Sequence, residues 1–93
     1  MILVSYDISS DKVRNRVFKI CKNYGQRIQY SVFECNISAK RYRELYGKLI
    51  KETAQMQEGS IRFYDICENC MQKIRVIGNT KTSDEKEDDV IVI

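Results

Sequence analysis

Apolar and mixed positions alternate with a period of two along the first nine residues. Ile2, Val4, Tyr6 and Ile8 share one face of the strand that this pattern predicts, and the other face carries Asp7 near the C-terminal end. Aspartate is uncommon in strands, so its presence needs a reason. Either the strand ends in a turn and the carboxylate faces water, or the carboxylate binds a ligand.

Two later segments repeat their apolar residues at helical spacing. The first follows the capping sequence at residues 9–11, and we expect it to end with Gly25 as its C-cap. The second follows Ser38, which we expect as its N-cap. The predicted buried stripes consist of Val13, Val17, Ile20, Cys21 and Tyr24, and of Tyr42, Leu45, Tyr46, Leu49, Ile50 and Thr53. Lys and Arg occupy much of the remaining surface, so both helices are amphipathic with basic exteriors.

Residues 26–37 have the pattern of one long strand that is apolar on both faces. Such a strand belongs to a sheet that is covered on both sides. Two helices can cover one side of a small domain, and a second copy of the chain could cover the other. Further strands are expected at residues 60–67 and 74–77, with a short helical turn or loop between them. We therefore predict an α+β domain over residues 1–78.

Residues 79–93 are expected to form a separate part of the chain. Their first ten residues are polar, acidic and without periodicity, which is typical of a linker. The β-branched residues Val90, Ile91, Val92 and Ile93 predict a terminal strand that must pair with a sheet edge of the same chain or of a partner. No apolar run exceeds four residues, so we expect neither a transmembrane helix nor contact with a membrane. Because a signal-peptide pattern is also missing, we expect a cytoplasmic protein.

The chain contains no histidine, which narrows its possible chemistry. Histidine is the commonest general base, so Ser-His and Cys-His hydrolase mechanisms are excluded. Hydrolysis by this protein would have to use carboxylates, a metal ion, or Lys, Arg and Tyr side chains. Asp7 is the residue whose position best suits such a role.

Four cysteines are best interpreted as free thiols, because nothing predicts secretion. Cys67 and Cys70 have the spacing of a zinc half-site, but one such pair without histidine cannot supply four ligands in one chain. A zinc ion shared by two chains is a less favoured alternative, and a thioredoxin-like redox pair is less favoured still.

Basic residues are concentrated in the first half of the chain. Residues 1–51 contain eleven Lys and Arg against four acids, whereas residues 52–93 contain five against nine. The overall net charge of +3 therefore understates how basic the N-terminal half is. This distribution favours a polyanionic partner, although charged helix faces are more often simply solvated.

Several motifs together resemble a known family. Tyr6-Asp7-Ile8 ends the first strand, Arg14-x-Arg16 opens the first helix, and the segment Tyr24-Gly-Gln-Arg-Ile-Gln-Tyr-Ser-Val-Phe-Glu34 follows that helix. The pattern continues with Ile61 to Tyr64, the Cys67-x-x-Cys70 segment and Val76-Ile77-Gly78, and it ends with Asp89 to Ile93. Over essentially its whole length the chain resembles the CRISPR-associated Cas-two (Cas2) family, the small subunit of the spacer-acquisition complex.

This resemblance implies a ferredoxin-like βαββαβ sandwich with an extra C-terminal strand, in a homodimer packed through the sheets. It also implies a metal-dependent endonuclease that acts on RNA or duplex DNA and bridges dimers of the Cas-one (Cas1) integrase. Asp7 would be the catalytic residue, and would bind Mg²⁺ or another divalent cation together with Asp7 of the second chain. Mg²⁺ commonly uses one or two carboxylates, with water and phosphate oxygens as its other ligands. The C-terminal strand, Val90 to Ile93, would extend the sheet of the partner.

Further site residues follow from the same resemblance. Contacts to nucleic-acid phosphates are expected from Arg14, Arg16 and Arg27, with Lys12 and Lys19 widening the basic track. Tyr6, Ser31 and Phe33 would lie near the metal site or pack the dimer, and for Tyr6 and Phe33 we favour packing. Two alternatives stay open: a non-catalytic scaffold for duplex DNA in the integrase complex, and a toxin-type ribonuclease similar to the VapD group.

Overall fold

The computed structural model describes residues 1–78, and its strands and helices follow the order βαββαβ with one short helix added. A single sheet contains all four strands in the order β2-β3-β1-β4, and every neighbouring pair is antiparallel. This arrangement confirms the predicted α+β, ferredoxin-like fold. The elements are β1 (Ile2–Asp7), α1 (Asp11–Lys22), β2 (Gln26–Gln29), β3 (Val32–Cys35), α2 (Ala39–Glu52), β4 (Ser60–Asp65) and α3 (Glu68–Met71).

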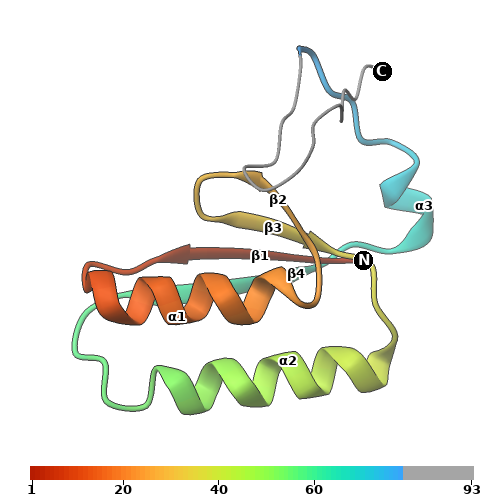
Figure 1. Cartoon of the computed structure of the whole chain (residues 1–93). Coiled ribbons are helices and arrows are strands. Elements are labelled where there is room, and N and C mark those ends of the chain that lie inside the picture. Colours follow the sequence, from red (N-terminus) through yellow and green to blue (C-terminus); the bar gives the residue numbers. More distant parts are fainter. Residues whose placement is uncertain (79–93) are drawn as a thin grey trace.

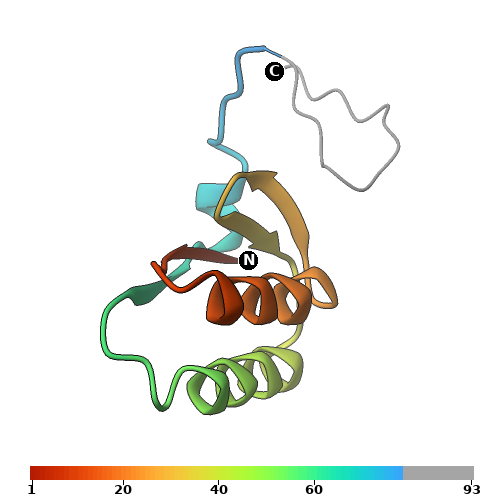
Figure 2. The same cartoon turned by 60° about the vertical axis from the view of Figure 1, so that its left-hand side comes forward.

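Helices α1 and α2 lie on the same side of the sheet, as the two views in Figures 1 and 2 show. The short helix α3 lies beyond the end of the sheet, close to the N-terminus (Figure 1). Two backbone hydrogen bonds tie that region together: the Met1 amino group donates to the Ile66 carbonyl, and the Ile66 amide donates to the Met1 carbonyl. Neither α1 nor α2 covers the opposite face of the sheet.

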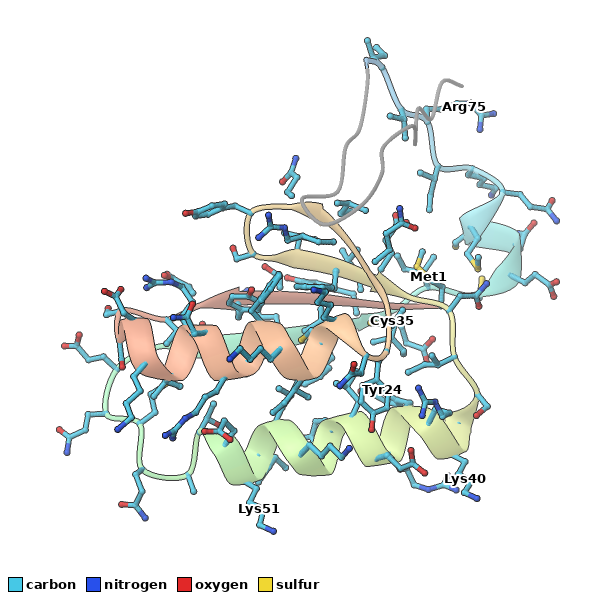
Figure 3. The ribbon with its side chains drawn as sticks, in the orientation of Figure 1. Met1, Tyr24, Cys35, Lys40, Lys51 and Arg75 are labelled. Atoms are coloured by element: carbon cyan, nitrogen blue, oxygen red, sulfur yellow. The ribbon has the colours of Figure 1, made fainter. Side chains whose placement is uncertain are left out.

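The central strand β1 divides the molecule into two faces, as its alternation predicts. Ile2, Val4 and Tyr6 are buried toward the helices, whereas Asp7 at the end of the opposite face is exposed. The core also contains the apolar face of each helix and the inward residues of β3, and Figure 3 shows Tyr24 and Cys35 between the sheet and α2. The buried residues are Ile2, Val4, Tyr6, Ile8, Val17, Cys21, Tyr24, Phe33, Cys35, Leu45 and Leu49. Tyr46 and Ile50, which we expected in the buried stripe of α2, are exposed.

Serine side chains cap both long helices at their N-termini. The Ser10 hydroxyl accepts a hydrogen bond from the Val13 amide, and the Ser38 hydroxyl accepts one from the Arg41 amide, each at 3.2 Å. Both bonds satisfy amides that have no partner within the helix.

The predicted role of Gly25 as a helix C-cap is wrong, because α1 ends at Lys22 with Asn23 as its cap. Gly25 does not have a positive φ angle, so backbone freedom does not explain the glycine. A Cβ atom at this position would come within 2.3 Å of the Glu34 carbonyl oxygen and 2.5 Å of the Cys35 sulfur. Glycine therefore allows the chain to pass close to β3 as it leaves α1.

Residues 26–35 form a hairpin, so the prediction of a single long strand over residues 26–37 is wrong. Strands β2 and β3 are antiparallel partners that reverse direction at Tyr30 and Ser31, with an irregular register between Arg27 and Gln29. The reversal was hidden because these residues include no glycine, proline or Asn-Gly pair, which are the usual signals of a tight turn. The apolar residues of this segment therefore belong to two strands. Their pattern did not show that a single strand is covered on both faces.

The strand expected at residues 74–77 is not formed. After α3 the backbone turns, with the Lys73 amide donating to the Cys70 carbonyl and the Ile74 amide donating to the Met71 carbonyl. The chain then has no regular structure up to Gly78. The expected linker and terminal strand over residues 79–93, including Val90 to Ile93, lie outside the described residues. Within residues 1–78, no helix is long and apolar enough to cross a lipid bilayer.

Candidate nucleic-acid interface

Asp7 is the last residue of β1 and lies on the sheet face opposite the helices. Its side chain is exposed, and within residues 1–78 it has neither an ion pair nor a hydrogen bond to another side chain. The strand register places Ser5, Ser60 and Arg62 on the same face, with Ser60 directly opposite Asp7 on β4. An unpaired carboxylate beside two hydroxyl groups and a guanidinium is available to a ligand from outside the chain.

Asp7 can supply only part of a metal site by itself. In the described part of the chain, no group of three or more His, Cys, Asp or Glu side chains is close enough to bind one ion. Magnesium sites of this kind need one or two carboxylates, with water and phosphate oxygens completing the coordination. The exposed position of Asp7 on the uncovered face therefore fits half of a shared site, and the second carboxylate would have to come from another chain.

A small cleft lies on the other side of β1, between the start of α1 and the tip of the β2–β3 hairpin. Its volume is about 180 Å³. Two arginines enter it, and no acidic side chain lines it, so the cleft is electropositive. The lining residues are Tyr6, Arg14, Asn15, Phe18, Arg27, Tyr30 and Ser31.

Arg27 is the arginine of this cleft that is best placed to bind a phosphate. Its guanidinium lies 5.0 Å from the ring centre of Phe18 and 5.9 Å from that of Tyr30. These cation–π contacts hold the group in place but leave its hydrogen-bond donors unused. Among residues 1–78, no carboxylate forms an ion pair with it.

The other two predicted phosphate contacts are already occupied within the chain. Arg14 donates to the Ile8 carbonyl at 2.8 Å and pairs with Asp11, which fixes the connection between β1 and α1. Arg16 pairs with Glu52 at 3.1 Å and thereby joins α1 to α2. Both side chains keep some exposed surface, but a phosphate would have to compete with these partners.

Lys12 and Lys19, the two remaining basic residues that we predicted to bind nucleic acid, are exposed on α1. They belong to the same helix as the cleft residues Arg14, Asn15 and Phe18. Such side chains act as mobile point charges and raise affinity without specifying sequence.

Tyr6 and Phe33 are both buried in the core, but only Tyr6 also lines the cleft. Tyr6 is buried and stacks near Phe33, with ring centres 6.4 Å apart, while its side chain also lines the cleft. Burial raises the pKa of the Tyr6 hydroxyl, and Cys21 adds to this effect, whereas Arg27 and Arg14 lower it. Phe33 is 1% exposed and packs against Phe18 at 5.7 Å, so it belongs to the core of its own chain, away from the face that carries Asp7.

The predicted site residues therefore fall into two groups on opposite faces of β1. Asp7 lies on the uncovered face, whereas Tyr6, Arg14, Arg27 and Ser31 line the cleft on the helix side. Sequence reasoning missed Asn15, Phe18 and Tyr30 in the cleft, and Ser60 and Arg62 beside Asp7. The spacing of Arg27 and Tyr30 around a turn could have suggested a contact, but only if the hairpin had been recognised.

Comparisons with known proteins identify relatives over most of the chain. Residues 1–74 match the family described as CRISPR associated protein Cas2. The chain is 36% identical over 90 residues to the CRISPR-associated endoribonuclease Cas2 1 of Chloroflexus aurantiacus, with 97% of each protein covered. It is 39% identical over 80 residues to the CRISPR-associated endoribonuclease Cas2 2 of Methanospirillum hungatei, covering 83% of this chain and 84% of that protein.

Solved structures show the same similarity. The crystal structure of Cas2 from Streptococcus pyogenes superimposes with a TM-score of 0.65 and 32% identity, covering 83% of this chain and 98% of the other. A chain of a partial Cas6-RT-Cas1–Cas2 complex superimposes with a TM-score of 0.67 and 30% identity, covering 82% and 88%.

Proposed function

Because the chain belongs to the CRISPR-associated Cas2 family, we propose that it is a metal-dependent endonuclease acting on RNA or duplex DNA in CRISPR adaptation. The observation that carries this proposal is the unpaired, exposed carboxylate of Asp7 in a chain without histidine. A carboxylate of this kind can take part in hydrolysis by binding a divalent cation. The names of the relatives, CRISPR-associated endoribonuclease, support the same class of activity.

The proposed active form is a homodimer in which two chains meet through their uncovered sheet faces. Each chain contributes one Asp7 carboxylate, and together they meet the usual carboxylate number of a magnesium site. A divalent ion held there would polarise the phosphodiester bond that is cleaved. Arg62, on the same sheet face as Asp7, would bind the adjacent phosphate, and Arg27 would position the strand from the other side of β1.

Metal removal tests the proposal directly. Purified protein is incubated with end-labelled RNA and with duplex DNA, in Mg²⁺ or in excess EDTA. We expect cleavage in Mg²⁺ and none in EDTA, with activity restored when Mg²⁺ is added back. Cleavage that continues at the same rate in EDTA would contradict a metal-dependent mechanism.

Binding should depend on Arg27 more than on other surface cations. Arg27→Ala is expected to weaken RNA binding about tenfold in EDTA, because one charge-assisted contact to phosphate is lost. The slope of log affinity against log salt should decrease by about 0.7 to 0.9. Fluorescence anisotropy with a labelled RNA at several salt concentrations measures both quantities.

Lys51→Ala is the matched control for Arg27→Ala. It removes the same charge from an exposed position on α2, where the side chain points away from the sheet (Figure 3). This variant should bind RNA almost as well as the unchanged protein. Equal losses in the two variants would show that affinity follows net charge and that the cleft has no special role.

A second candidate function is a structural role in a complex with Cas1. The similarity to a chain of a Cas1–Cas2 complex supports it. In that role the protein would hold duplex DNA and the integrase without cleaving, and Asp7 would serve only the dimer. Family membership favours either function over the toxin-type ribonuclease.

A further inference from the structure

Two exposed cysteines flank the start of α3, and neither takes part in the function proposed above. Cys67 is the N-cap residue of this helix, and its Sγ accepts a hydrogen bond from the Cys70 backbone amide at 3.4 Å. Cys70 is the third residue of α3 and lies one helical turn after Cys67, so the two side chains are neighbours. Cys67 directly follows Ile66, whose backbone is held by two hydrogen bonds to Met1.

These contacts make the two thiols chemically different from each other. The pKa of Cys67 is lowered, mainly because the Cys70 amide stabilises its thiolate. The pKa of Cys70 is raised, because the neighbouring Cys67 sulfur favours the protonated form of the Cys70 thiol. One accessible thiol that ionises readily, beside a second that can resolve a mixed disulfide, is the arrangement used in thiol–disulfide exchange.

The other two cysteines of the chain provide a contrast. Cys21 and Cys35 are buried in the core, where desolvation raises their pKa values to about 12 and about 11. They cannot form thiolates near neutral pH, and reagents cannot reach them in the folded protein. Reactivity should therefore be confined to the pair at α3.

We propose that Cys67 and Cys70 form a redox-active dithiol that exchanges with low-molecular-weight disulfides such as oxidised glutathione. The Cys67 thiolate attacks one sulfur of the small disulfide, which forms a mixed disulfide and releases one thiolate. The Cys70 sulfur then loses its proton and attacks Cys67, which closes the intramolecular disulfide and releases the second thiolate. The protein loses two electrons and two protons, and one oxidised glutathione becomes two reduced glutathione molecules.

The alternative role for this pair is to bind a soft metal ion such as zinc. Two thiolates supply only half of a tetrahedral zinc site. Within residues 1–78, no third His, Cys, Asp or Glu side chain is close enough to join them. The pair is complete as a dithiol but incomplete as a metal site, which favours redox chemistry.

The test uses the full chain, purified with and without a chelator and then reduced. After treatment with oxidised glutathione without oxygen, the intact protein should become two hydrogen atoms lighter, and peptide mass spectrometry should link Cys67 to Cys70.

Cys70→Ser should instead accumulate a mixed disulfide with glutathione on Cys67. Cys67→Ser should react about tenfold more slowly at pH 7. Cys21 and Cys35 serve as internal controls and should stay unmodified until the protein is unfolded.

Both substitutions are at exposed positions, so circular dichroism should show unchanged folding. Three results would overturn the proposal: absence of the Cys67–Cys70 link, equal reactivity of the two single variants, or thiols that react only after a chelator removes bound zinc. The last result would assign the pair to a zinc site shared between chains. None of these outcomes bears on nuclease activity, which is measured separately.

Discussion

Asp7→Asn is expected to lower Mg²⁺-dependent cleavage at least about 100-fold, because a metal site contributes several kcal/mol to the transition state of phosphodiester hydrolysis. The amide keeps the size and shape of the carboxylate but loses the charge that a hard divalent cation requires. Since Asp7 is exposed and unpaired within the described residues, the free energy of unfolding should change by less than about 0.5 kcal/mol. Initial cleavage rates and urea unfolding curves for the same preparations measure both effects.

Asp65→Asn is the matched control for this experiment. Asp65 is also an exposed aspartate at the end of a strand, but the register pairs it with Ile2, at the other end of the sheet from Asp7. This control should cleave as fast as the unchanged protein. If Asp7→Asn retained full metal-dependent activity, Asp7 would not be the catalytic carboxylate.

The same variants separate the two proposed functions. A protein that never cleaves, but binds duplex DNA and Cas1 with or without the Asp7 substitution, would support the structural role. Sedimentation of the chain as a monomer at every concentration would exclude a site that two Asp7 residues share.

Phe33→Ala is expected to reduce the free energy of unfolding by about 3 to 5 kcal/mol, as is usual when a fully buried phenylalanine is removed. The ring is 1% exposed and contacts both Tyr6 and Phe18, so its loss leaves a cavity between β3 and α1. Small domains have roughly 5 to 15 kcal/mol in total, so a substantial part of the stability would be lost. Urea titration followed by circular dichroism measures the change.

Tyr30→Ala provides the comparison, because this aromatic residue lies on the same hairpin but is 82% exposed. Its effect on stability should stay within about 0.5 kcal/mol.

Any loss of cleavage in Phe33→Ala should follow the fraction of unfolded protein and recover at lower temperature. A well-folded Phe33→Ala protein without activity would contradict the core assignment and place Phe33 in the active site.

The elements with a regular pattern were the ones that sequence reasoning located correctly. The alternation in β1 assigned Tyr6 to the core and Asp7 to the opposite face, and both assignments are confirmed. The serine caps marked the starts of α1 and α2 for the same reason: each depends on contacts within one turn of a helix. Gly25 was also noticed, but its purpose depends on β3, which lies about ten residues away in the sequence.

The candidate site was only partly predictable. Asp7, Arg14 and Arg27 were identified as functional candidates, but their separation onto two faces of β1 was not, because that depends on how the hairpin folds back over α1. Likewise Arg16 was counted among the phosphate contacts, whereas its ion pair with Glu52 joins two helices whose relative position no local pattern contains.

Local patterns in the sequence were enough to predict the fold class, the core faces of β1 and α1, and the carboxylate on which the proposed chemistry depends. Those features follow from periodicity and from residues that are close along the chain. Three features became visible only in the folded structure: the hairpin of β2 and β3, the enclosure of Phe33 by its own chain, and the contact between Cys67 and Cys70 at an exposed helix end. These features depend on packing and hydrogen bonds between backbone segments, which a pattern of apolar and polar residues does not specify.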